Sequence, residues 1–356
     1  MMPPLRTVLL SLLLAILPLQ RLIPQQPSDF TLRGTVLTAE TSEPVPYGIV
    51  EVHGLAPRLT DETGHFGIAA LRAGSYHFVV RQIGYLPFDS TIAIPATSPL
   101  LIRLKRLGVL LSPVTVSGTS DCRRPGAPDP TVTPALAIVF DQVVANARRM
   151  RLLAEEHPHR LRIERTLTDL QLPRRNERSV TDTFDVKSTD RWPYRPGHIV
   201  SRVGYEEDIR GRRLTRLWEN QDLIRLPTLE DFADSTFVAT HCFSFVGRDT
   251  LQGGTFLRID FRPTTRIKTS DVAGATYLDS TTYMARYTVV EVTHPAQAAL
   301  GLISLIATSR FCEAMPGILV TDWILALSRT RGESLMERTE EQRLITMELM
   351  TRPPGP

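Results

Sequence analysis

The sequence lacks the short motifs that mark most enzymes. None of its eight histidines is followed by Glu three residues later, so the His-x-x-Glu zinc pair of peptidases is absent. It also has no Gly-x-Ser-x-Gly elbow, no Ser-x-x-Lys, no phosphate-binding glycine loop and no dinucleotide fingerprint. We therefore expect no catalytic residues, no metal site and no cofactor.

Lysine is scarce, and the net charge is only +3. Short basic stretches such as Arg148–Arg151 are interleaved with acidic residues, which is typical of a solvated surface. No zinc-finger, helix-turn-helix or RNP pattern accompanies them, so nucleic-acid binding is not expected. Long apolar runs are missing too, since none reaches the ~20 residues of a membrane helix. The sequence therefore predicts no transmembrane span once a leader is removed.

Residues 1–25 have the form of a secretion signal. Arg6 precedes a leucine-rich, uncharged stretch from Thr7 to Gln20, and prolines occur at its end. This order is typical of a signal peptide. No small-x-small triplet fixes a cleavage site, so an uncleaved N-terminal anchor stays open. The pattern predicts a protein of the periplasm or one associated with the outer membrane.

The chain has only three cysteines, Cys122, Cys242 and Cys312. No two of them lie close in sequence, which disfavours a zinc site. Export would allow one disulfide and leave one thiol over, with three pairings possible. Three buried thiols are the alternative.

Residues 29–105 alternate apolar and polar side chains in short runs that turn residues separate. The stretch Asp61-Glu62-Thr63-Gly64 is typical of a hairpin turn, with Gly64 where a positive φ is needed. About 75 residues suffice for seven short strands that close over one core. The pattern predicts a β-sandwich.

Five motif blocks follow one another in this segment: Gly34-x-Val36, Pro44-Val45-Pro46 with Val50-x-Val52, Thr60-Asp61-Glu62-x-Gly64-x-Phe66, Leu71-x-Ala73-Gly74-x-Tyr76, and Ile83-Gly84-Tyr85. In order and spacing they resemble the carboxypeptidase regulatory-like domain, a transthyretin-like sandwich. The blocks also have a structural interpretation. Gly64 and Gly74 are turn glycines, Phe66 and Tyr76 face inward from adjacent strands, and Gly84 bends the chain before Tyr85. We assign structural roles to Gly34, Asp61, Gly64, Phe66, Gly74, Tyr76, Gly84 and Tyr85.

Residues 106–132 are rich in Gly, Pro, Asp and Arg, which predicts a linker. Within them Leu110–Gly118 resembles the short strand that follows this domain in TonB-dependent outer-membrane receptors. The 238 residues after Gly118 carry no long ladder of amphipathic strands, so a 22-stranded transporter does not fit.

A long helix is predicted next. Thr133 is a suitable cap, Pro134 suits the first turn, and the pattern ends at His157-Pro158. One apolar stripe recurs every three or four residues and predicts packing against the protein's own core. Its members are Leu136, Phe140, Val143, Ala147, Met150 and Ala154.

Alternation returns after the helix and predicts a series of strands. They are 161–168, 180–188, 235–245, 255–261, 275–278, 283–292, 300–307, 318–327 and 343–350. Residues 133–352 are therefore expected to form an α+β domain, an antiparallel and half-barrel-like sheet with one long helix. The fold class of the whole chain is mainly β.

Two stretches, Asp234–Phe243 and Phe261–Asp279, resemble the region that accompanies the regulatory-like domain in a group of bacterial envelope proteins. That resemblance implies a disulfide between Cys122 and Cys242 and leaves Cys312 free. His241 precedes Cys242 directly, and adjacent strand residues face opposite sides, which argues against a nucleophile pair. The meander with one helix is also similar to the half-barrel of periplasmic lipoprotein carriers, an analogy of fold alone.

These observations predict an exported, non-catalytic binding or scaffold protein of the envelope, with a protein or polysaccharide partner. The first alternative is a carrier of a lipid or small apolar ligand, which requires an apolar cavity of roughly 300–1,000 Å³ between helix and sheet. The second is a hydrolase whose site assembles from distant residues. It requires a cleft where His157, His159, His198 or His294 meets a carboxylate or hydroxyl.

Overall fold

The computed structural model describes residues 29–108, 121–173, 176–190, 193–203, 221–315 and 317–350. The predicted secretion signal (1–25) and the predicted short strand Leu110–Gly118 lie outside the described residues. The domain boundaries of the sequence analysis stay predictions.

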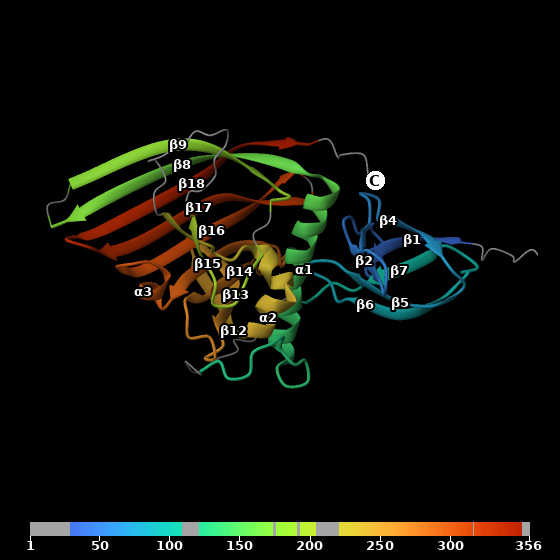
Figure 1. The fold of residues 1–356 in the computed structure, drawn as a ribbon. Coiled ribbons are helices and arrows are strands. Elements are labelled where there is room, and N and C mark those ends of the chain that lie inside the picture. Colours follow the sequence, from blue (N-terminus) through green and yellow to red (C-terminus); the bar gives the residue numbers. More distant parts are fainter. Residues whose placement is uncertain are drawn as a thin grey trace, which may run out of the picture.

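The first region is a seven-stranded sandwich, as predicted. One sheet has the order β4-β1-β7 and the other has the order β3-β2-β5-β6 (Figure 1). Val36, Phe78 and Ile102 are fully buried between them. The strands are β1 (Phe30–Thr38), β2 (Ile49–Val52), β3 (Arg58–Leu59), β4 (His65–Leu71), β5 (Gly74–Arg81), β6 (Phe88–Ile94) and β7 (Leu100–Leu104).

The glycines of the sandwich act as backbone positions. Gly64 has φ +76° and ends the turn in which its N–H donates to the Asp61 carbonyl. The Phe66 ring packs where a Cβ on Gly34 would stand. Gly74, in contrast, is the first residue of β5. Phe66 and Tyr76 do not lie on neighbouring strands of one sheet, because β4 and β5 belong to opposite sheets, and Tyr76 is only half-buried.

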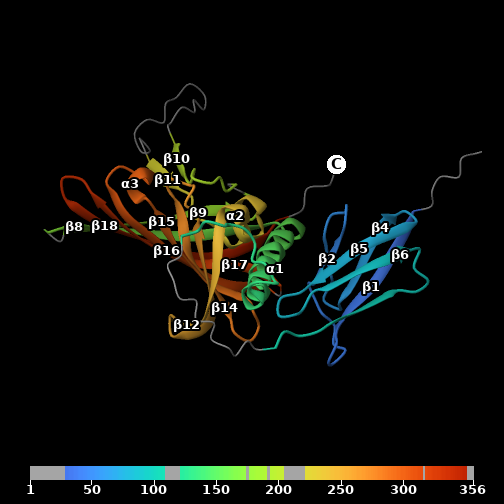
Figure 2. The same ribbon diagram turned by 90° about the horizontal axis from the view of Figure 1, so that it is seen from below.

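Helix α1 (Pro134–Glu156) has the predicted bounds, with Thr133 and His157 as its caps. Proline is tolerated in the first turn because that N–H has no helical partner. Phe140, Val143 and Ala147 of the predicted stripe are buried against the second core. The helix packs across the concave side of the large sheet (Figures 1 and 2). No helix within the described ranges is long and apolar enough to cross a membrane.

The second region is built on a nine-stranded antiparallel sheet that does not close into a barrel. Its order is β12-β13-β14-β15-β16-β17-β18-β8-β9. The strands are β8 (His159–Leu172), β9 (Asn176–Lys187), β12 (His241–Leu251), β13 (Gly254–Pro263), β14 (Asp271–Asp279), β15 (Ala285–Thr293), β16 (Leu302–Met315), β17 (Ile318–Arg331) and β18 (Leu335–Leu349).

One predicted strand is wrong in its first half. Residues 235–240 form helix α2 (Ser235–Thr240), and β12 begins only at His241. The Asp234 carboxylate accepts hydrogen bonds from the N–H groups of Thr236 and Phe237, which caps the helix. The helix therefore forms although the alternating pattern of these residues favours a strand. The remaining elements are β10 (Val200–Val203) paired with β11 (Gln221–Ile224), the 3-10 helix η1 (Leu229–Ala233) and α3 (Pro295–Ala298).

Helix α1 also connects the two regions (Figure 2). The Gly84 N–H donates to the Gln142 side chain at 2.7 Å, and Arg148 forms an ion pair with Glu51 at 2.7 Å. A disulfide joins Cys122 to Cys242 on strand β12, and Cys312 is a free thiol. This is the pair that the resemblance to the envelope proteins implies.

Candidate ligand-binding groove

The concave face of the large sheet divides into two halves. Under α1 its side chains are apolar and closely packed. Phe261 and Ile259 of β13 and Val290 of β15 are at most 2% exposed. Phe261 contacts the rings of Phe232 and Phe237 edge-on, at centroid distances of 5.3 and 5.7 Å. We call this the covered half.

The same face becomes polar on the outer strands β18, β8 and β9, beyond the helix. Because side chains alternate, Arg165 lies on the same face of β8 as Ile163, and Asp182 stands opposite it on β9. Arg165 Nε donates to Asp182 at 3.0 Å. Asp169 and Arg338 form a second cross-strand ion pair at 2.6 Å, and both side chains are partly exposed. We call this the open half.

A groove of about 200 Å³ lies where the covered half meets the open half. Its floor consists of β8, β9, β17 and β18, and its wall is the last turns of α1 together with η1. Most of the floor is apolar, with Ile163, Val186 and Leu344 facing Met150 and Ala154 of the helix. At roughly 30 Å³ per water-sized group, the space holds a chain of about seven methylenes.

The rim of the groove is polar. Lys187 and Asp190 flank the turn after β9, where the Asp190 carboxylate accepts from the Lys187 N–H at 3.3 Å. Glu230 of η1 and Asp322 of β17 also line the groove, and Arg151 donates to the Glu230 carbonyl oxygen at 3.1 Å. Asp322 is held by Arg310, at 2.7 Å between Nη2 and Oδ2. Polar groups at the mouth of an apolar floor can orient an amphipathic ligand.

Two further hollows lie where the sandwich meets α1. One is a cleft of about 600 Å³ between the β3–β4 turn region and the end of α1, lined in part by Tyr47, Phe66 and Leu153. The other, of about 450 Å³, is lined by Tyr47, Arg149 and Glu313 among others. Arg149 is 8% exposed, and its guanidinium lies over the Tyr47 ring. Burial lowers the pKa of Arg149, while Glu313 acts in the opposite direction.

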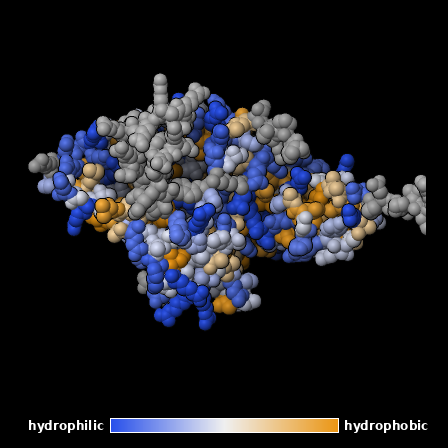
Figure 3. All heavy atoms as spheres, in the orientation of Figure 1, coloured by the Kyte–Doolittle hydropathy of each residue, from blue (hydrophilic) through white to orange (hydrophobic). Residues whose placement is uncertain are grey.

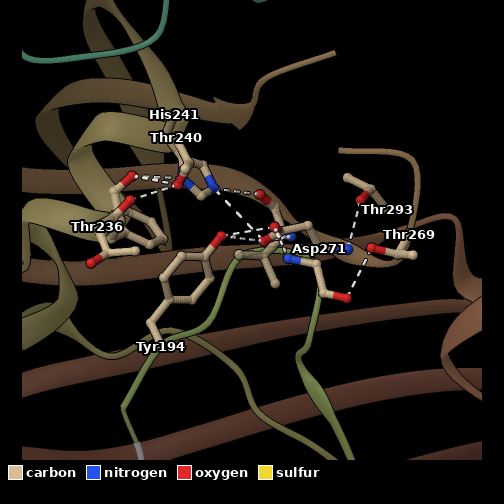
Figure 4. Close-up of polar contacts among 10 residues, drawn as sticks. Tyr194, Thr236, Thr240, His241, Thr269, Asp271 and Thr293 are labelled. Atoms are coloured by element: carbon tan, nitrogen blue, oxygen red, sulfur yellow. Dashed lines mark hydrogen bonds and ion pairs between the residues drawn. The ribbon is translucent and has the colours of Figure 1, made fainter. Parts of the chain in front are cut away.

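A buried polar network lies in the covered half (Figure 4). Asp271 is 0% exposed, and its carboxylate accepts from Tyr194 Oη at 2.7 Å and from the Gly197 N–H at 2.8 Å. These bonds fix the segment around Tyr194 to strand β14. Burial, and next the charge of Asp271, raise the pKa of Tyr194. The phenol therefore remains a hydrogen-bond donor to Asp271.

His241 completes this network. Its Nδ1 lies 2.9 Å from the Phe237 carbonyl oxygen, and its Nε2 lies 3.2 Å from that of Val272. Burial lowers the pKa of His241, although both carbonyls and Asp271, 3.9 Å away, act against it. None of the three hollows is lined by Tyr194, His241 or Asp271. A ligand in one of these three hollows would therefore not touch the network.

The histidines considered for a hydrolase do not share one hollow. His157 lines the cleft, whereas His159 is buried and lines the groove, whose lining also includes Ser188 and carboxylate residues. The Nδ1 atom of His159 lies 2.9 Å from the His157 carbonyl oxygen. His198 and His294 are exposed and line none of the three hollows. Within the described ranges, no group of three or more His, Cys, Asp or Glu residues could hold a metal ion.

Sequence reasoning did not find the groove residues. Met150 and Ala154 were expected on the core-facing stripe of α1, and both line the groove wall. Their partners Ile163, Val186 and Leu344 belong to strands whose pairing is set by distant parts of the chain. The local signal is only the alternation of β8 and β9, which does not reveal where the helix stops covering them.

Comparison with known proteins assigns the first region. Residues 31–105 match the model of the carboxypeptidase regulatory-like domain, so the sandwich is such a domain, as its motif blocks indicated. This match covers about a fifth of the chain. No curated protein sequence matches the chain significantly.

Among solved structures, the chain is similar to a domain from Vibrio parahaemolyticus named for outer membrane lipoprotein sorting. The identity is 11%, the match covers 60% of this chain and 94% of that one, and the TM-score is 0.32. A DUF1329 family protein from Desulfovibrio piger has 10% identity, 61% and 93% coverage, and a TM-score of 0.31. Because the sequence identities and TM-scores are so low, these similarities say nothing about a ligand of this protein.

Proposed function

We propose that this protein is a non-catalytic binding protein of the bacterial envelope that holds a short apolar chain in the groove between α1 and the large sheet. The observation that carries the proposal is the apolar floor of Ile163, Val186 and Leu344 opposite Met150 and Ala154. Apolar surface that water can reach gains about 25 cal/mol for each Å² that a ligand covers.

The size of the groove limits what it holds. Its volume of about 200 Å³ is below the 300–1,000 Å³ typical of sites that enclose a drug-sized ligand. One alkyl segment of about seven carbons fits, and the rest of the ligand extends past the polar rim or along the open half.

Two features support an envelope location. The leader-like residues 1–25 have the form of a secretion signal. The Cys122–Cys242 disulfide is of a kind that persists in oxidising compartments such as the periplasm. The regulatory-like sandwich, fixed to α1 by Gln142 and Arg148, holds the groove wall in place.

Binding of a neutral apolar fluorophore, N-phenyl-1-naphthylamine, tests the proposal. Val186 on β9 lines the groove, and Val180 lies on the same face of the same strand outside it. Both valines are partly exposed, at 36% and 52%, so neither change disturbs a closed core. Val186→Trp should fill the groove and weaken binding at least tenfold, whereas Val180→Trp should leave it unchanged.

Equal affinities for the two tryptophan variants would place the fluorophore elsewhere and contradict the proposal. Far-ultraviolet circular dichroism and the thermal midpoint of each variant show that the comparison is made between folded proteins. A fluorophore signal that Tyr47→Ala abolishes and Val186→Trp does not would assign binding to the cleft at the sandwich instead.

A further inference from the structure

The cleft between the sandwich and the end of α1 has an apolar floor that reaches the surface. Helix α1 stands between the large sheet and the sandwich (Figure 1). Phe66 of β4, Leu153 of α1 and Ile318 of β17 line the cleft and are at most 6% exposed. Met315 and Leu349 line it as well, but they are 41% and 53% exposed. A ligand that covers this apolar surface removes it from water, which favours binding.

The acidic residues that line the cleft are Asp61, Glu62 and Glu156. The Asp61 carboxylate is turned back into its own turn, where it accepts from backbone N–H groups. Glu62 is exposed, and it lies beside Tyr47 of the cleft wall, whose Oη donates to Glu62 Oε1 at 3.4 Å. No lysine or arginine is among the described residues that line the cleft. Glu62 therefore brings a negative charge to the cleft without a cation beside it in the lining.

Glu156 faces the cleft from the last turn of α1. Arg149, Leu153 and Glu156 follow one another at intervals of four and three residues, so they lie on one face of the helix. This face is turned toward the sandwich, because the Arg149 guanidinium lies over the ring of Tyr47. Glu156 is half-buried, and within the described ranges its carboxylate forms no ion pair or hydrogen bond.

The end of α1 adds to the negative potential of the cleft. The helix dipole places a negative partial charge at the C-terminus, where cations are favoured and carboxylates are disfavoured. Glu156 is the last residue of α1, and the last turn contains no basic residue. Arg149 lies two turns earlier and lines the adjoining hollow, where Glu313 is 3.6 Å away. A cation in the cleft would be attracted by Glu62, by Glu156 and by the helix end.

We infer that the cleft binds a short basic and apolar peptide segment of a partner protein. A lysine or arginine side chain lies among Glu62, Glu156 and the end of α1, and an apolar side chain covers Met315 and Leu349. At roughly 30 Å³ per water-sized group, the volume of about 600 Å³ holds two or three residues. A phosphate-bearing lipid headgroup would be repelled by the carboxylates, and a neutral glycan supplies no cation.

A methyl NMR titration of the full chain with two capped tripeptides of equal shape tests the inference. One is N-acetyl-Leu-Arg-Leu-amide, and the other has citrulline, the uncharged isostere of arginine, in its centre. At low salt and pH 8, where an ordinary histidine is neutral, the arginine peptide should bind at least tenfold more tightly. This ratio should fall in 0.5 M NaCl, because salt screens exposed charges. The methyl chemical shifts of Met315 and Ile318 should change, and those of Ile163 in the groove should stay constant.

Charge-removing variants make the test specific. Glu62→Gln and Glu156→Gln should each weaken binding of the arginine peptide severalfold and leave binding of the citrulline peptide unchanged. Glu348→Gln is the matched control. It removes the same charge beside Leu349 in sequence, and strand alternation turns its side chain to the opposite face of β18. It should change neither affinity.

The thermal midpoint separates a loss of binding from a loss of folding. Glu156→Gln should keep or raise the midpoint, because a carboxylate is disfavoured at the C-terminal end of a helix. Weaker binding by this variant would then come from the missing charge.

Equal affinities of the two tripeptides, or no binding of either, would overturn the inference. Methyl shifts at Ile163 in place of Ile318 would also overturn it, because the peptide would then occupy the groove. If Glu156→Gln and Glu348→Gln weakened binding equally, the overall charge of the protein would explain the preference and the inference would fail. The cleft is separate from the groove, so the comparison of Val186→Trp with Val180→Trp tests the proposed function independently.

Discussion

The two halves of the concave face are built from one sheet and one alternating pattern, yet they differ in almost every physical respect. In the covered half, Phe261 and Val290 are closed off by α1, η1 and α2. In the open half, the equivalent positions carry ion pairs such as Arg338–Asp169, and Val180 is 52% exposed. The strand pattern decides which side chains share a face, and the helix decides which part of that face becomes core.

The groove follows from this difference. Where the helix ends, the floor is still apolar at Ile163 and Leu344, and nothing in the described residues fills the space above it. On the face seen in Figure 3, the described hydrophobic side chains lie in small groups among hydrophilic ones, with a larger group over the sandwich. A boundary between packed core and open sheet therefore supplies a binding surface without a dedicated cavity.

The sharpest contrast should come from one phenylalanine in each half. Phe261→Ala should lower the free energy of unfolding by about 3–5 kcal/mol, since it leaves a cavity among packed rings. Phe184→Ala should cost only about 1 kcal/mol, because Phe184 is half-buried on β9 beneath Arg165. Chemical denaturation measures both. If both variants lost a similar free energy of unfolding, Phe184 would have to be packed in solution as tightly as Phe261.

Strand β12, whose His241 belongs to the covered half, carries Cys242 of the disulfide on its other face. Replacing Cys122 and Cys242 by Ala should lower the free energy of unfolding by about 2–4 kcal/mol, because the bond closes a chain segment with a sequence separation of 120. Reductant should lower the stability of the unaltered protein equally and have no effect on the double variant. Cys312→Ser is the control, and its stability should still respond to reductant.

Acid should act on the covered half through His241. Burial lowers its pKa below the ordinary 6.5, so the unfolded chain takes up a proton that the folded chain does not. The free energy of unfolding should therefore fall as the pH drops below about 6.5, by up to about 1.4 kcal/mol for each pH unit, until the lowered pKa is reached. His241→Gln should remove this part of the slope. If the His241→Gln variant kept the same dependence of the free energy of unfolding on pH, His241 would not be a buried and neutral side chain in the folded protein.

The smallest effect belongs to the open half. Arg338 and Asp169 are 49% and 30% exposed, so their coupling in a double-mutant cycle should be about 0.2–1 kcal/mol and should decrease with salt. Arg338→Gln and Asp169→Asn, singly and together, provide the cycle. A coupling free energy of several kcal/mol that does not change with salt concentration would mean that another element covers this ion pair.

The elements that local chemistry specifies could be predicted from the sequence. Proline at the start and His157-Pro158 at the end define α1. Asp61 and Gly64 form the predicted turn, but the expectation of a hairpin is wrong, because β3 and β4 on either side of the turn belong to opposite sheets. Helix α2 was missed because the alternation of residues 235–245 continues through it, while the cap at Asp234 acts on a single turn.

The groove could not be predicted because it depends on pairing between distant segments. Strand β8 follows α1 directly, but its neighbour β18 comes some 170 residues later, and Ile163 meets Leu344 only through that pairing. The Cys122–Cys242 pair came from the resemblance to the envelope proteins; the spacing of three cysteines leaves every pairing possible.

Methyl NMR of the isoleucines during titration with N-methyldecanamide tests the central claim most directly. Ile163 and Ile324 line the groove, Ile318 lines the cleft beside the sandwich, and Ile306 and Ile345 are exposed elsewhere. If the groove binds the amide, the methyl chemical shifts of Ile163 and Ile324 should change and reach saturation. The methyl chemical shifts of Ile318, Ile306 and Ile345 should stay constant. Shifts confined to Ile318, or no saturable shift at all, would contradict it.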